Sequence, residues 1–134
     1  MIKKGVGVFF IFFLLLGVGF SWAKMPEIAQ EDWVSISGEI DETKAEETIT
    51  ALLNLEAQPE TSPVGIRIFS SGGSLTAVMA ICDVIRSMQR PVVTVALGEA
   101  LSGAALILSS GDIRYISEHS IITVSYTHLT LPTN

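Results

Sequence analysis

Apolar residues recur along the chain either at every second position or at every third to fourth position. Segments of the two kinds alternate. Apolar and other residues alternate at 33–37 and again at 64–69, which is typical of strands that bury one face. Residues 92–97 are apolar almost throughout, as in a strand buried on both faces. At 43–55 and 75–88, between these segments, apolar residues are spaced by three and four, which predicts helices.

The last third of the predicted domain continues the alternation of strands and helices. Small residues at 102–110 predict a helix, and short strands are predicted at 113–116 and 120–124. Thr43 and Glu46 have the spacing of a capping box, so the first helix is expected to begin there. The order predicts an α/β fold with a mainly parallel sheet, βα repeats and right-handed crossovers. The predicted buried helix faces comprise Ala45, Ile49, Leu52 and Leu53 in the first helix, and Leu75, Val78, Met79, Cys82, Ile85 and Met88 in the second.

The most hydrophobic part of the chain lies at its start. Lys3 and Lys4 precede an uncharged stretch at 5–23, which ends in the small residues Ser21 and Ala23 on either side of one tryptophan. This pattern predicts a secretory signal peptide at 1–23 and an exported protein, periplasmic or membrane-associated. An uncleaved signal anchor is the alternative, because the stretch approaches the ~20 residues that span a bilayer.

Composition narrows the class of protein without identifying it. The 134 residues are 49% hydrophobic and 16% charged, which predicts one globular domain behind the apolar segment. The net charge is −6, so nucleic-acid binding, which needs a basic surface, is not predicted. Cys82 is the only cysteine and is expected on a buried helix face, so no internal disulfide is predicted. The two histidines and one cysteine lack metal-ligand spacing, and neither a metal nor a cofactor is predicted.

Two short motifs indicate chemistry. Ser102 lies among small residues where the third predicted strand gives way to a helix, so its hydroxyl has room to act as a nucleophile. Ser70-Ser71-Gly72-Gly73-Ser74 follows the second strand, and a glycine pair can direct backbone N–H groups at a developing oxyanion. Together the motifs predict acyl transfer, whereas Ser102 alone fits a helix N-cap or a small core residue equally well.

Both motifs resemble those of the Clp protease proteolytic subunit, a self-compartmentalising serine peptidase with the ClpP/crotonase fold. The resemblance covers residues 33–124 and rests on the segment 68–83 together with the Ser102 motif at the family's own separation. It implies that Ser102 is the nucleophile and that the N–H groups of Gly73 and Gly103 form the oxyanion hole. The chain departs from the family at Ser71, where proline is usual, so one backbone N–H is freed and the loop is expected to be looser.

The resemblance also implies a catalytic histidine and aspartate, and the chain matches neither. Counting on from Tyr115 puts the histidine position at Ser125, and the aspartate would fall beyond Asn134. His119 is expected in an exposed loop. His128 could approach the site only if its strand slipped in register, which would change the face its side chain takes.

The chain changes character abruptly after Val124. Residues 125–134 resemble the translated sequencing-adapter tails found at the ends of some assembled gene fragments. We therefore expect 24–124 to be part of a ClpP/crotonase-like peptidase domain that natively continues, and 125–134 to be a non-native tail. The full-length product is expected to be a peptidase, and the chain as given to be inactive because it lacks the histidine and the aspartate.

Other functions fit some of these features. Signal peptide peptidases share the fold and use a Ser-Lys dyad, but the lysines here, Lys3, Lys4, Lys24 and Lys44, all precede Ser102. A non-catalytic crotonase-like scaffold could bind peptides or assemble with paralogues. The resemblance implies a peptide or unfolded protein as substrate, homo-oligomeric rings and an ATP-driven unfoldase as partner. Export argues against the unfoldase, which would lack ATP outside the cytosol.

Overall fold

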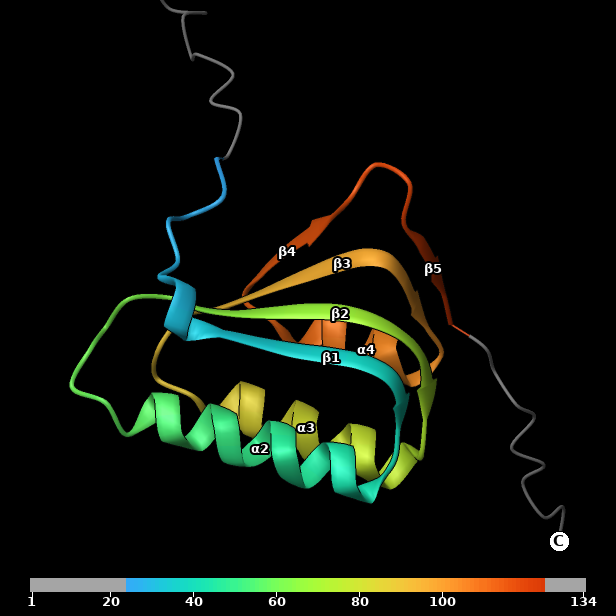
Figure 1. Cartoon of the computed structure of the whole chain (residues 1–134), viewed down its shortest axis with the longest axis horizontal. Coiled ribbons are helices and arrows are strands. Elements are labelled where there is room, and N and C mark those ends of the chain that lie inside the picture. Colours follow the sequence, from blue (N-terminus) through green and yellow to red (C-terminus); the bar gives the residue numbers. More distant parts are fainter. Residues whose placement is uncertain (1–23, 125–134) are drawn as a thin grey trace, which may run out of the picture.

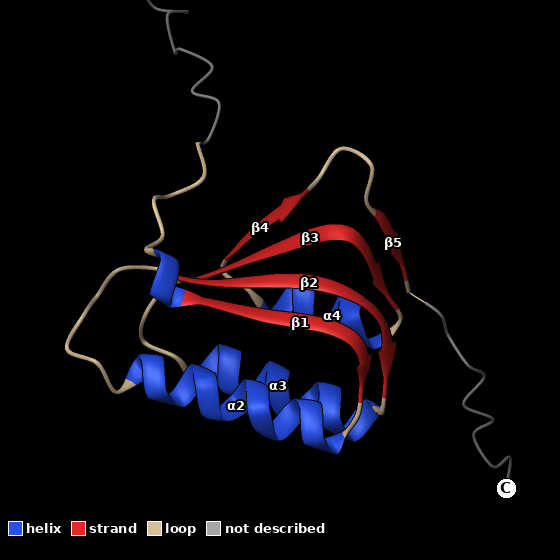
Figure 2. Ribbon diagram, viewed as in Figure 1, coloured by secondary structure: helices blue, strands red, loops and turns tan. Residues whose placement is uncertain are grey.

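The computed structural model describes residues 24–124, and five parallel strands organise them (Figures 1 and 2). Strands β1 (Trp33–Ile40), β2 (Val64–Gly73), β3 (Val92–Leu101) and β4 (Ile113–Ile116) lie side by side in chain order. Strand β5 (Ile121–Thr123) pairs with the end of β3 instead of continuing beyond β4. The predicted α/β fold with a parallel sheet is confirmed.

Three helices connect the strands. They are α2 (Glu42–Glu56), α3 (Leu75–Ser87) and α4 (Gly103–Ser110), and a 3-10 turn, η1 (Gln30–Asp32), precedes the sheet. Because consecutive strands are also neighbours, right-handed crossovers place the helices on one face of the sheet, as Figure 1 shows for α2 and α3. Within residues 24–124, no helix covers the opposite face.

The core lies between the sheet and the helices, and alternation along the strands explains it. Val64, Ile66 and Ile68 of β2 are fully buried, as their spacing predicts. Ile36 of β1 and Ala96 of β3 extend the same layer. Cys82 is 1% exposed in α3, which confirms its interpretation as a small core residue.

Two details of the helices differ from the prediction. Helix α2 is capped by Asp41, whose carboxylate accepts from the Lys44 amide at 2.7 Å, so the capping box at Thr43 is wrong. Asp41 is the N-cap residue because it directly follows the strand and keeps an extended backbone. Leu53 of α2 is 50% exposed, and in α3 Leu75 and Met79 are 62% and 41% exposed, all contrary to expectation. The helix is turned so that the buried face is formed by Ala77, Val78, Ile81, Cys82 and Ile85.

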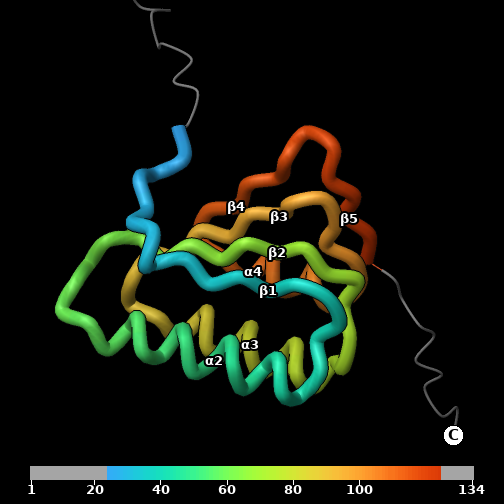
Figure 3. The backbone as a smooth tube through the Cα atoms, in the orientation of Figure 1, coloured from blue at the N-terminus to red at the C-terminus, as the bar shows by residue number. Residues whose placement is uncertain are grey.

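Strands β2 and β3 are longer than predicted, because each continues through a glycine segment as an irregular strand. The β2–β3 register shifts between Ile68 and Ser70, and the β1–β2 register shifts nearby, between Ser37 and Glu39. Beyond the shift Ser70 pairs with Ala100, so the carboxyl ends of the two strands stay side by side (Figure 3). Both site motifs therefore lie at one end of the sheet.

Several predictions fall outside the described residues. The signal segment at 1–23 and the tail at 125–134 are among these, so they stay predictions. Within residues 24–124, no helix is both long enough and apolar enough to cross a membrane. The same residues contain no group of three or more His, Cys, Asp or Glu side chains that could hold a metal ion.

Candidate active site

Ser102 occupies the sharp turn between β3 and α4. Its φ of 51° and ψ of −119° make it the only non-glycine residue with positive φ in the described part of the chain. Such strained backbone persists only where its surroundings hold it, and it is common at functional sites. The side chain is half-buried, does not cap α4 and has no hydrogen-bond partner among residues 24–124. Ser102 thus occupies the N-cap position of α4 without a capping hydrogen bond from its side chain.

The glycine pair of β2 lies directly against this turn. Gly72 has a φ of 94°, and a Cβ added to it would stand 2.7 Å from the Leu101 carbonyl oxygen and 3.0 Å from the Gly103 nitrogen. The same position is 3.1 Å from the Ser102 Cβ. The two motifs that the sequence separates are thus in backbone contact, and only glycine fits at position 72.

Gly73 directly follows Gly72, and Gly103 directly follows Ser102, so both predicted donors adjoin the contact between the two motifs. Ser74 N–H donates to the Ile40 oxygen at 2.8 Å, toward β1. Gly73 is exposed and packs against the Ile40 backbone of β1. Gly103 opens α4, and the first amides of a helix lack partners within it.

Further residues fasten the Ser102 turn, and the sequence patterns did not single them out. The Ser102 amide donates to the Thr123 oxygen at 2.7 Å, which fixes the turn to β5. Gly103 packs against Val78 so closely that a Cβ would stand 2.6 Å from its Cγ2. The hydroxyl of Ser120 bridges the Gly98 amide and the Ala96 oxygen, at 2.9 and 3.0 Å.

His119, the one histidine among residues 24–124, is not placed beside Ser102. His119 is exposed, as expected, in the turn between β4 and β5. That turn is fastened to β3 near Gly98, four residues before Ser102, or about 13 Å along an extended strand. His128 and Ser125 lie outside the described residues.

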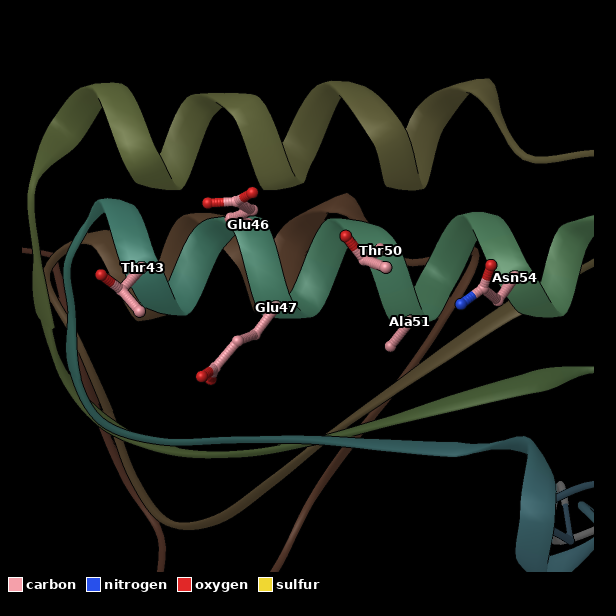
Figure 4. A pocket seen from close by; sticks show the side chains of 6 residues that line it. All are labelled: Thr43, Glu46, Glu47, Thr50, Ala51 and Asn54. Atoms are coloured by element: carbon pink, nitrogen blue, oxygen red, sulfur yellow. The ribbon is translucent and has the colours of Figure 1, made fainter.

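A shallow hollow elsewhere on the molecule is not part of this site. Figure 4 shows its lining side chains on the outer surface of α2, and they include Glu46 and Glu47. Helix α2 also contains Lys44, whose Nζ pairs with Glu47 at 3.1 Å. None of the predicted site residues lines this hollow.

Comparisons with known proteins identify the family. The model of the Clp protease family matches residues 21–127. The chain is 35% identical over 102 residues to the ATP-dependent Clp protease proteolytic subunit 2 of Streptomyces avermitilis, covering 75% of this chain and 51% of that protein. It is 40% identical over 78 residues to subunit 1 of Rhodopirellula baltica, covering 58% of this chain and 34% of that protein.

A solved structure is similar as well. A ClpP1 mutant from Listeria monocytogenes matches with a TM-score of 0.65 and 29% identity, over 69% of this chain and 54% of that one. The chain thus spans about half the length, or less, of the relatives described here. The family match covers more than half of the chain and includes both motifs. The chain belongs to the Clp protease family.

Proposed function

We propose that this chain carries the nucleophile and the oxyanion-binding groups of a serine endopeptidase that hydrolyses peptide bonds. The observation that supports this most strongly is the backbone contact between Gly72 and the Ser102 turn. There a half-buried hydroxyl, without a partner among residues 24–124, lies between the glycine pair and the start of α4. Membership in the Clp protease family supports the same reaction class.

The proposed reaction begins with attack on a peptide carbonyl. The Ser102 Oγ forms a bond to the carbonyl carbon, and the carbonyl oxygen takes the negative charge as the tetrahedral intermediate forms. Gly73 and Gly103 N–H groups donate to that oxygen. Loss of one such donor typically costs about 3 kcal/mol of transition-state stabilisation. The amine then leaves, and water hydrolyses the acyl-serine in a second step of the same kind.

The Ser102 proton must go to a base, which transfers it to the leaving amine. We propose that the base and its orienting acid come from residues that follow Val124. Residues 24–124 alone would therefore bind the oxyanion without activating the serine. A Ser-Lys dyad would also need a lysine from outside the described part. Lys44 is engaged with Glu47 on α2, and Lys24 lies before β1, near Trp33, at the opposite end of the sheet from Ser102.

A fluorophosphonate probe tests the proposal on the full-length product. We expect covalent labelling that peptide mapping assigns to Ser102, and we expect Ser102→Ala to lose it completely while keeping the same circular dichroism spectrum. Ser109→Ala is the matched control, because Ser109 is an exposed serine of α4, the helix that follows Ser102, and its hydroxyl bonds only the Leu106 oxygen among the described residues. Folded protein that is not labelled, or equal labelling of Ser102→Ala, would favour a non-catalytic peptide-binding scaffold.

We further propose that the full-length product assembles into a homo-oligomeric ring and acts on peptides or unfolded protein. Phe69 and Leu97 support assembly, because they are 54% and 42% exposed on the sheet face that no helix covers. Gel filtration is expected to give an oligomer, which Phe69→Glu should dissociate. Leu53→Glu on α2, where Leu53 is 50% exposed, should leave it intact. A monomeric wild-type peak would contradict the ring.

A further inference from the structure

Ser70 is a polar residue in a fully buried position of β2. It is 0% exposed and continues the inward-facing series of Val64, Ile66 and Ile68. It also lies where the strand registers shift on both sides. A hydroxyl at such a place is unfavourable unless its hydrogen bonds are made.

The Ser70 hydroxyl joins two glycines on neighbouring strands. It donates to the Gly38 oxygen at 2.6 Å and accepts from the Gly72 amide at 3.0 Å. Both glycines have positive φ, 76° and 94°, so each lies where the regular strand geometry breaks. One side chain thus supplies partners to backbone groups at both irregularities.

Gly72 connects this clamp to the site. Its α-carbon rests against the Leu101–Gly103 backbone, and the next amide along the chain is that of Gly73. Ser71, the residue between the two bonded positions, is exposed, so burial does not hold it. The Ser70 hydroxyl is the side-chain contact that fixes the Gly72 amide within the described part.

We infer that Ser70 is a positioning residue, which holds Gly72 against the Ser102 turn and thereby sets the distance from the Gly73 amide to the Ser102 Oγ. This role rests on the proposed peptidase function, because the spacing matters only if Gly73 stabilises an oxyanion. Without the Ser70 hydroxyl, the Gly72 amide loses its partner and the glycine pair can move away from the nucleophile. Ser70 touches no reacting atom, so it acts through Gly72.

Ser70→Ala in the full-length product is the test variant, and Thr94→Val is its matched control. Thr94 is also 0% exposed, and its hydroxyl donates to a backbone oxygen, that of Leu108, at 2.7 Å. Both variants lose one buried hydroxyl, with two hydrogen bonds in Ser70→Ala and one in Thr94→Val, so both should lose stability. For Ser70→Ala alone we expect kcat and the fluorophosphonate labelling rate to fall by about tenfold or more, with KM within about twofold. Ser70→Thr, which retains the hydroxyl, should recover part of the loss.

Amide hydrogen exchange supplies a readout that does not depend on activity. The Gly72 amide should be protected in the wild type and in Thr94→Val, and it should exchange faster in Ser70→Ala. Labelling of Ser70→Ala at the wild-type rate, or an unprotected Gly72 amide in the wild type, would overturn the role of Ser70 alone. Wild-type protein that is folded yet never labelled would overturn the peptidase proposal, and this inference with it.

Discussion

Gly72→Ala is expected to destabilise the protein by about 3 kcal/mol and to abolish labelling of Ser102. Two effects add. At a φ of 94° an L-residue is strained, and the new Cβ would meet backbone atoms of Leu101 and Gly103 at 2.7 and 3.0 Å. Backbone cannot move aside as a flexible side chain can, so β2 and the Ser102 turn must separate.

Gly38→Ala is the matched control for this variant. Gly38 has a similar φ of 76°, but nothing lies within 4 Å of an added Cβ. It should therefore lose only about 1 kcal/mol from backbone strain and keep its labelling. Urea unfolding and probe labelling of both variants measure the difference. Equal stability losses, with full labelling of Gly72→Ala, would contradict the contact between the two motifs.

Asp32→Ala is expected to lower the free energy of unfolding by about 3–5 kcal/mol, although Asp32 is not part of the candidate active site. Asp32 is 0% exposed, and its Oδ1 lies 2.9 Å from Nη2 of Arg90, itself 4% exposed. The contact is an ion pair without good hydrogen-bond angles. Arg90 also donates to the Leu55 and Ser62 oxygens, so it ties η1, the end of α2 and the loop before β2 together. Removing the carboxylate leaves a buried guanidinium without its counter-charge.

Lys44→Ala provides the comparison, because it breaks the exposed pair with Glu47 at 3.1 Å. We expect a loss of no more than about 0.5 kcal/mol, since solvent screens exposed pairs. Urea unfolding at low ionic strength distinguishes the two. If Asp32→Ala were as mild as Lys44→Ala, the buried pair would not be what holds η1 and the α2–β2 loop to the sheet.

Patterns of period two and period three to four predicted which segments are strands and which are helices, because each element buries one face. The alternation of strands and helices then predicted the parallel sheet. They could not predict the rotation of α3, where Met79 points outward, since that depends on where α4 packs. They also missed the irregular ends of β2 and β3, because a register shift depends on partners from other strands. The patterns also placed the helix N-cap at Thr43, whereas it is Asp41, because the end of the preceding strand determines where the helix begins.

The candidate site was predictable in part. Small residues around Ser102 and the glycine pair identified both motifs, but only folding brings Gly72 against the Ser102 turn. Ser70 did carry a sequence signal, since a serine follows three apolar residues at inward positions. Its two bonds depend on bulges that a single strand does not reveal.

The proposed peptidase activity depends most on where the oxyanion binds, and a crystal structure of the phosphonylated full-length product measures this directly. We expect phosphorus bonded to the Ser102 Oγ, with the phosphoryl oxygen about 3 Å from the nitrogens of both Gly73 and Gly103. A phosphoryl oxygen directed to solvent or to other donors, or phosphorus on another residue, would contradict the account.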